Sequence, residues 1–136
     1  MQAESEISKK VQGRLDQWEK WGIVLFHDRY NAGHINLGYR WVKLCKTGHP
    51  DRIAYLNIDN TCWIYLIEVK DEDGKQSPKQ VEFEEIFQGM KNVVYELVRS
   101  PKQIDITLER ISRRCDKLFI DADVHMGLLK VEEETF

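Results

Sequence analysis

The sequence predicts an α/β fold in a single domain, because helical and strand patterns alternate along its 136 residues. The first segment repeats apolar residues at three- and four-residue steps, as an amphipathic helix does. The middle holds two apolar runs rich in β-branched and aromatic residues, which is typical of strands. Two Ser-Pro pairs later in the chain each introduce a further amphipathic stretch. A chain of this length holds enough apolar residues for one core.

The N-terminal helix is predicted from Glu4 onward. Its apolar stripe consists of Ile7, Val11, Leu15 and Trp18. Glu4 lies on the face of this stripe, so we expect its carboxylate to point inward, whereas Glu6 falls on a different face. The alternative is a fraying, exposed Glu4 that interacts only with the helix macrodipole.

Two strands are predicted in the middle of the chain, at residues 53–56 and 63–67. Asp51 stands before the first strand, after a Gly/Pro turn, and Glu68 closes the second. If residues 57–60 form a hairpin turn, the start of the first strand lies opposite the end of the second. Asp51 would then lie beside Glu68. The alternative is a turn aspartate with purely local hydrogen bonds.

The end of the second strand places an acid and an amine on one face. Glu68 and Lys70 are two residues apart and so project to the same side, while Val69 turns to the other. A Glu and a Lys that close an apolar strand lose hydration unless they pair or bind a metal. A hard cation takes carboxylate oxygens, and a nearby ammonium can help the attacking water, so this pair suits metal-assisted hydrolysis. Asp73 and Lys75 have the same spacing but sit in a polar turn, where we expect them to stay solvated.

Together these residues resemble the VRR-NUC branch of the PD-(D/E)xK nuclease superfamily, which comprises small viral and bacterial nucleases. The motifs that carry the resemblance are Gly48-x-Pro50-Asp51, Glu68-x-Lys70 and Ser77-x-x-Gln80, with Glu4 in the preceding helix. The resemblance extends from about Glu4 to Arg99. It implies a restriction-endonuclease-like αβββαβ core, in which helices flank a mixed sheet, with an extra C-terminal helix.

The resemblance also implies what each residue does. The implied ligands of Mg²⁺ or Mn²⁺ are Glu4, Asp51, Glu68 and the carbonyl of Val69, with Glu6 as the alternative to Glu4. Lys70 would act on the attacking water. Gln80, at the start of the following helix, would contact the water, Lys70 or the phosphate, unless it is an ordinary surface residue. The implied catalytic residues are therefore Asp51, Glu68, Lys70 and Gln80.

A cationic window precedes Asp51. Residues 29–50 contain no Asp or Glu, although the whole chain has a net charge of -3. A polyanion would approach the metal from this side. The expected DNA contacts are Arg40, Lys43, Lys46, His49 and Arg52. Contacts of this kind bind phosphates without reading bases, so we expect structure-guided or weakly specific cleavage. The alternative is a solvated loop and strand with incidental basic residues.

The second half of the chain completes the α/β pattern. Ser77 and Pro78 predict a helix to about Gly89, and residues 92–98 read as the next strand. The apolar positions of this helix are Val81, Ile86 and Met90. Ser100 and Pro101 introduce a second helix, whose stripe consists of Ile104, Leu108, Ile111, Cys115 and Leu118. The stripe predicts core packing or, alternatively, pairing with a second subunit in a homodimer. We expect a nuclease domain at 1–120 and an acidic extension, a short strand or tail, at 121–136.

Composition excludes several other classes. The chain has no long apolar run and no signal peptide pattern, so we expect a cytoplasmic protein of bacterial or phage origin without a membrane partner. Its three cysteines, Cys45, Cys62 and Cys115, predict buried free thiols rather than a disulfide framework or a zinc site.

The sequence as a whole therefore predicts a Mg²⁺- or Mn²⁺-dependent endonuclease. Its expected substrate is structured or branched DNA, such as a four-way junction or a flap, and its expected products carry 5′-phosphate and 3′-hydroxyl ends. A symmetric dimer would match the symmetry of a junction. The alternative is a non-catalytic DNA-binding or scaffolding module that retains the nuclease fold.

Overall fold

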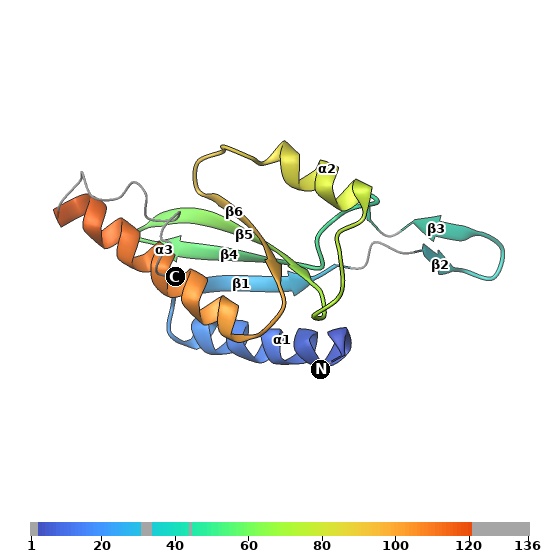
Figure 1. Ribbon diagram of the computed structural model, residues 1–136, viewed down its shortest axis with the longest axis horizontal. Coiled ribbons are helices and arrows are strands. Elements are labelled where there is room, and N and C mark those ends of the chain that lie inside the picture. The colour runs from blue at the N-terminus through green and yellow to red at the C-terminus, as the bar shows by residue number, and fades with distance from the viewer. Residues whose placement is uncertain (1–2, 31–33, 44, 121–136) are drawn as a thin grey trace.

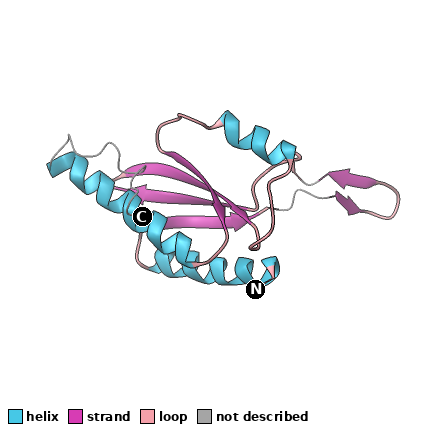
Figure 2. Ribbon diagram, viewed as in Figure 1, coloured by secondary structure: helices cyan, strands magenta, loops and turns pink. Residues whose placement is uncertain are grey.

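A computed structural model describes residues 3–30, 34–43 and 45–120 of the chain (Figure 1). This part is an α/β protein with three helices, a mixed four-stranded sheet and a separate two-stranded ribbon (Figure 2). The elements are α1 (Glu4–Lys20), β1 (Val24–Arg29), β2 (His34–Asn36), β3 (Trp41–Lys43), β4 (Arg52–Ile58), β5 (Thr61–Val69), α2 (Pro78–Ile86), β6 (Val93–Val98) and α3 (Lys102–Ile120). The expected acidic extension, 121–136, lies outside the described residues.

The four-stranded sheet has the order β1-β4-β5-β6. Its β1-β4 and β4-β5 pairs are antiparallel, and the β5-β6 pair is parallel, with α2 in the connection. Helices α1 and α3 contact each other and both pack on the sheet, so they cover one face of it (Figure 1). On β4 the side chains of Ala54, Leu56 and Ile58 alternate with less buried neighbours, as a strand with one covered face requires.

The hairpin between β4 and β5 has the expected position. Asp59 and Asn60 have φ angles of 60° and 65°, the left-handed conformation that a two-residue type I′ turn needs. The side chain of Asn57 supports the turn by accepting the N–H of Asn60 at 3.0 Å. Arg52 consequently pairs with Ile67, so the beginning of β4 faces the end of β5.

The stripes of the first and last helices form the core. In α1, Ile7, Val11 and Leu15 are buried, and Trp18 packs against them. The stripe of α3 contributes Ile104, Leu108 and Ile111, which are also fully buried. The side chains of the last two stripe positions, Cys115 and Leu118, lie outside the described residues. Core packing is thus confirmed for the first three positions of α3.

Helix α2 differs from the expectation. It begins after the Ser77 cap as predicted but ends at Ile86, and none of its residues is buried. Val81, Ile86 and Met90, which the sequence offers as its apolar face, are exposed. The helix is instead fixed at its first turn, where the Gln80 N–H donates to the Ser77 hydroxyl and the Ser77 N–H donates to the Gln80 amide oxygen.

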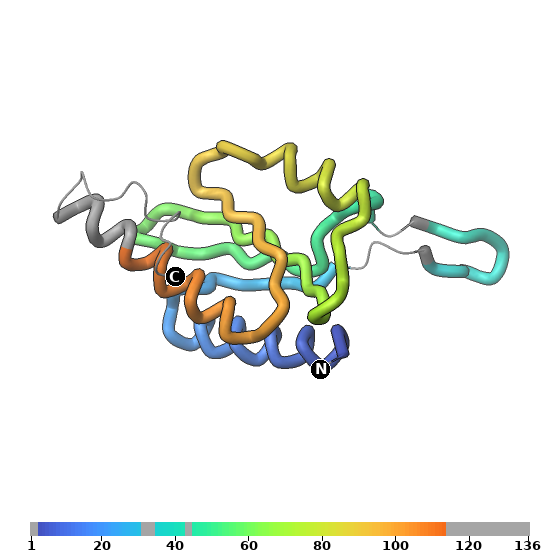
Figure 3. Tube along the Cα trace, viewed as in Figure 1, coloured from blue at the N-terminus to red at the C-terminus, as the bar shows by residue number. Residues whose placement is uncertain are grey.

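The cationic window contains an element that the sequence analysis missed, the ribbon of β2 and β3. Figure 3 shows it projecting beyond the end of the sheet where β1 ends and β4 begins. The last residue of β1, Arg29, pairs with the first residue of β4, Arg52. The N–H of Tyr30 also donates to the Asp51 carbonyl at 2.7 Å. The chain therefore leaves the sheet and returns to it at the same place.

Two further expectations concern cysteines and membranes. Cys62 is exposed and Cys45 is half-buried, so burial of the thiols was wrongly predicted for Cys62, which lies near the solvent-facing start of β5. Cys115 is outside the residues whose side chains are described. Among the described helices, none combines the length and apolar content that crossing a bilayer requires.

Gly48 allows the turn before β4 to pack against α2. Its φ is +93°, and a Cβ at this position would lie 2.4 Å from the Lys79 carbonyl oxygen. Gly22 has a similar φ of +89°, but an added Cβ there would meet nothing within 4 Å. Gly22→Ala therefore tests the left-handed conformation alone, which costs about 1 kcal/mol.

We expect Gly48→Ala to lower the free energy of unfolding by at least about 2 kcal/mol more than Gly22→Ala, because a clash with backbone adds to the conformational strain. Urea denaturation of the two variants measures the difference. Equal losses would show that α2 does not pack on the turn as described.

Candidate active site

The candidate site lies at the end of the sheet where β4 begins and β5 ends. The hairpin pairs Arg52 with Ile67, and the same register continued by one residue places Asp51 opposite Glu68. The Asp51 carboxylate accepts the backbone N–H of Val69 through Oδ2 at 2.8 Å. This bond spans the two strands, so Asp51 is more than a turn aspartate with local contacts.

Glu68 and Lys70 project to the same side, as their spacing predicts. The Lys70 Nζ lies 3.4 Å from the Glu68 Oε2, and the two side chains are 16% and 2% exposed. Gln80 reaches the same oxygen from α2, donating through Nε2 at 2.8 Å. The alternative of Gln80 as an ordinary surface residue is thus wrong. Asp51, Glu68, Lys70 and Gln80 form one cluster.

Burial perturbs the ionisation of Glu68. Desolvation, followed by the charge of Asp51, raises the pKa of its carboxyl to about 7. Lys70 opposes this shift, while the charge of Glu4 adds to it. One oxygen, Oε1, is buried and has no hydrogen-bond partner among the described residues. A buried acceptor without a partner is unfavourable, so this atom suits a cation or a proton as its missing partner.

A second buried glutamate, Glu96, has hydrogen-bond donors for both of its carboxylate oxygens, as buried carboxylates usually do. Glu96 accepts hydrogen bonds from the Tyr65 hydroxyl, from Thr107 Oγ1 at 2.8 Å and from Gln103 Nε2 at 3.1 Å. Burial raises the pKa of Glu96, and these donors counteract the rise. Both of its oxygens therefore have partners, and the cluster joins β6 to α3. The unpartnered Glu68 oxygen distinguishes the candidate site from this structural cluster.

A cavity of about 290 Å³ adjoins the cluster. Its lining consists of Glu4, Ser5, Ser8, Arg29, Asp51 and Val69. Glu6 instead accepts the Ala3 N–H at the start of α1, at 3.3 Å, so of the two candidate glutamates only Glu4 faces the cavity. Glu4 is nevertheless exposed, which corrects the expectation that it points inward. It lies in the first turn of α1, before the helix reaches the core at Ile7.

The three expected acidic ligands do not converge fully. In the described part of the chain, the residues whose ligand atoms lie within 4.8 Å of one another are Asp16, Glu19 and His27. The set of Glu4, Asp51 and Glu68 is wider than this. At least one of the three carboxylates therefore has to move before all of them can bind one cation. Glu4 is the most exposed of the three and so has the most freedom to do so.

Comparisons with models of protein families, with curated proteins and with solved structures find no match.

Arg52 does not fit its expected role as a DNA contact. It is 2% exposed, and its guanidinium donates to the Ser8 carbonyl and hydroxyl and to the Gln12 side chain at 3.2 to 3.3 Å. Arg52 thus ties α1 to β4. Its position at the first residue of a strand with one covered face explains the error, since that face turns inward. Arg29, absent from the expected contacts, lines the cavity instead. It is the first residue of the acid-free window, which is the signal that could have identified it.

The other expected DNA contacts have different surroundings. The His49 ring packs against Tyr30 and Phe83, with centroids 4.9 and 5.5 Å apart, and its Nδ1 lies 2.7 Å from the Pro50 carbonyl oxygen. His49 therefore helps to hold the turn before β4. Arg40 is exposed, in the turn of the ribbon. The side chain of Lys43 lies outside the described residues.

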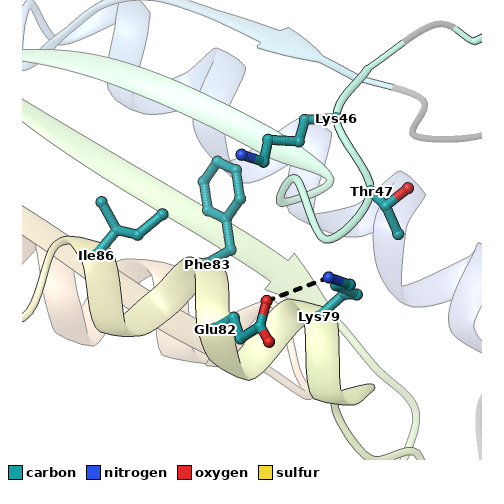
Figure 4. A pocket seen from close by; sticks show the side chains of 6 residues that line it. All are labelled: Lys46, Thr47, Lys79, Glu82, Phe83 and Ile86. Carbon is teal, nitrogen blue, oxygen red and sulfur yellow. Dashed lines mark hydrogen bonds and ion pairs between the residues drawn. The ribbon is translucent and has the colours of Figure 1, made fainter.

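Lys46 lines a second hollow of about 270 Å³, between the turn and α2 (Figure 4). Its other lining residues are Thr47, Lys79, Glu82, Phe83 and Ile86. In Figure 4, the side chain of Lys46 extends toward Phe83, and Lys79 pairs with Glu82 at 3.4 Å. Lys46 thus remains an exposed cation, but it faces the hollow between the turn and α2.

The group of Asp16, Glu19 and His27 lies elsewhere, between α1 and β1. His27 Nε2 is 2.7 Å from Asp16 and 3.8 Å from Glu19, which is the geometry of an ion pair when the ring is protonated. His27 Nδ1 is buried without a partner, whereas a metal-binding histidine normally donates from its other nitrogen. The group is therefore better described as a contact between His27 and Asp16 that joins β1 to α1.

Glu68 should make the stability of the metal-free protein depend on pH. Its folded pKa of about 7 exceeds the ordinary value of 4.5, so the unfolded chain releases the proton first as pH rises. The stability present below pH 4.5 is thus lost progressively up to about pH 7, by roughly 3 kcal/mol at most.

We expect Glu68→Gln to remove this loss. In EDTA, the variant should exceed the wild type in free energy of unfolding at pH 8 and differ little at pH 5, as measured by urea denaturation. Asp73→Asn, in the solvated turn, serves as the control and should follow the wild type at both values. A constant difference between Glu68→Gln and wild type across this range would contradict the raised pKa.

Proposed function

We propose that this protein is a metal-dependent deoxyribonuclease of the PD-(D/E)xK type, which hydrolyses phosphodiester bonds in structured or branched DNA. The observation that carries the proposal is the buried Glu68 carboxylate, which has one oxygen bound by Lys70 and Gln80 and the other without a partner. Asp51 approaches from the neighbouring strand. A carboxylate that is half satisfied in this way is prepared to bind a cation.

The architecture supports the same proposal. With the β2-β3 ribbon set aside, the element order is α1, β1, β4, β5, α2 and β6, followed by α3. This order agrees with an αβββαβ core and an extra C-terminal helix. The mixed sheet, with its antiparallel β4-β5 hairpin and parallel β5-β6 pair, is also in agreement. Fold alone does not determine activity, so the site carries the argument.

The residues present fit a divalent cation. Asp51, Glu68 and the Val69 carbonyl would hold it, with Glu4 joining from the cavity wall. Bound Mg²⁺ or Mn²⁺ would supply Lewis acidity toward the phosphate and would lower the pKa of a bound water. Oxygen ligands are the ones that these hard cations prefer.

Gln80 and Lys70 would orient the Glu68 carboxylate and the attacking water. Gln80 donates to Glu68 Oε2 and so directs the carboxylate, leaving Oε1 toward its missing partner. Lys70 holds a positive charge at 3.4 Å from the same carboxylate, where its ammonium can orient the attacking water by donating a hydrogen bond to it. Hydrolysis by this set should leave 5′-phosphate and 3′-hydroxyl ends. A homodimer with two such sites would suit a four-way junction.

The second candidate is a non-catalytic DNA-binding or scaffolding module. The failure of Glu4, Asp51 and Glu68 to converge within 4.8 Å favours it, because a ligand set that is not assembled binds a metal more weakly. Titration with Mn²⁺ in the presence of single-stranded, flap and junction DNA separates the two candidates. Cleavage of any of these substrates supports the nuclease, and tight metal-free binding without turnover on all of them supports the module.

Lys70→Ala should reduce cleavage by at least about a hundredfold while leaving DNA binding within about twofold, because the amine acts on the reaction rather than on affinity. Lys75→Ala is the matched control, since Lys75 has the same acid-x-Lys spacing but lies in an exposed turn. Gel assays of cleavage with Mg²⁺ and of binding in EDTA provide the two measurements. Full activity of Lys70→Ala would remove Lys70 from the catalytic set.

Divalent cations should stabilise the wild type and not Glu68→Gln. A ligand present at about 100 times its dissociation constant adds about 2.7 kcal/mol to the free energy of unfolding, which corresponds to several degrees in melting temperature. Thermal unfolding with and without Mn²⁺ measures the shift, and Asp73→Asn is again the control. The same Mn²⁺ shift in Glu68→Gln as in wild type would place the cation elsewhere.

A further inference from the structure

The β2-β3 ribbon exposes large apolar side chains that the core does not use. Tyr39 is 78% exposed and Trp41 is 66% exposed, and Ile35 and Leu37 are also exposed. The two strands pair only with each other in the described sheets. A two-stranded hairpin is marginally stable in water, and clustered exposed aromatics usually mark a binding surface.

The charge of the ribbon indicates an anionic partner. It lies within residues 29–50, which contain no Asp or Glu. The Arg40 guanidinium lies 5.8 Å from the centre of the Tyr39 ring, so a cation and an aromatic face are presented together. Aromatic rings combined with cations are what single-stranded nucleic acids bind, because bases stack on the rings and phosphates pair with the cations.

The position of the ribbon connects it to the candidate active site. It is inserted between Arg29, which lines the cavity, and Asp51, which belongs to the site. Figure 1 shows it extending from the same end of the sheet. A nucleic acid strand that crosses the site can therefore continue onto the ribbon.

We propose that the β2-β3 ribbon is a DNA-binding arm whose Trp41 and Tyr39 stack on unpaired bases beside the scissile phosphate. The inference rests on the proposed nuclease function and narrows its substrate to DNA with unpaired bases near the cleavage point, such as a flap or an open junction. Base faces inside a duplex are already stacked on their neighbours, so exposed aromatic rings discriminate in favour of unpaired bases.

A second copy of the chain is the competing occupant of this surface. Isologous pairing of two ribbons would bring Arg40 of one copy close to the cationic ribbon of the other, with no acid in either window to compensate. Charge complementarity therefore favours a polyanion over a second ribbon.

The test compares Trp41→Ala with Trp21→Ala in the full chain. Trp21, at the end of α1, is 58% exposed and matches Trp41 in residue type and exposure. Affinities for fluorescent single-stranded, flap and fully paired DNA are measured by anisotropy in EDTA. Trp41→Ala should weaken binding of the first two probes roughly tenfold and of the duplex less than about twofold. Trp21→Ala should change none of them.

Several outcomes would contradict the proposal that the ribbon is a DNA-binding arm. Unchanged affinity of Trp41→Ala for every probe would do so, as would an equal loss on duplex and single-stranded DNA, which would remove the preference for unpaired bases. A wild-type dimer that Trp41→Ala converts to a monomer, with DNA affinity unaltered, would assign the ribbon to subunit pairing.

A parallel cleavage assay separates this inference from the proposed function. If DNA binding depends on Trp41 but the wild type cleaves no DNA with Mg²⁺ or Mn²⁺, the ribbon binds DNA and the proposed nuclease function is wrong. If the wild type cleaves DNA but Trp41→Ala binds DNA as tightly as the wild type does, the nuclease function is supported and the ribbon is not a DNA-binding arm.

Discussion

The register of the β4-β5 hairpin is the constraint on which the site depends. A tight turn at Asp59 and Asn60 sets which residues face each other eight positions away, where Asp51 meets Glu68. A slip by one residue would turn Arg52 and the apolar residues of β4 to the opposite face, so burial of the core also enforces the position of the acids. The bond from the Val69 N–H to Asp51 closes the open end of the hairpin. Core packing and site assembly are therefore two results of the same pairing.

The two buried glutamates show how a fold can hold a charge for different purposes. Glu96 is surrounded by donors on β5 and α3 and behaves as a structural junction. Glu68 receives Lys70 and Gln80 on one oxygen and nothing described on the other. Such an arrangement is unfavourable for the apo fold, and proteins keep unfavourable polar groups mainly at functional sites. The geometry of Gln80 also supports a functional role for Glu68. The amide oxygen of Gln80 is fixed by the cap of α2, so its nitrogen must face Glu68.

Sequence patterns predicted most of the helices, the hairpin and the proximity of Asp51, Glu68 and Lys70, because each follows from a local rule. The expectation for Gln80 came from the resemblance to a nuclease family and did not include its bond to Glu68. Alternation fixes the side of Glu68 and Lys70, and the Ser77 cap fixes the start of α2. What the patterns missed depends on tertiary position. Arg52 looked like a surface cation, but the first residue of β4 already points under α1. Val81 and Ile86 looked like a core face, yet α2 lies at the edge of the fold. The ribbon, three residues per strand, is too short for periodicity to show.

The ribbon begins and ends at directly paired residues, Arg29 and Arg52. An insertion at such a point can lengthen, shorten or change sequence without altering the pairing of the strands on either side, and the entropic penalty grows only slowly with its length. Natural variation in this segment could accordingly retarget the protein while its chemistry stays constant. Grafting a different hairpin between these two arginines would be a direct way to engineer that change.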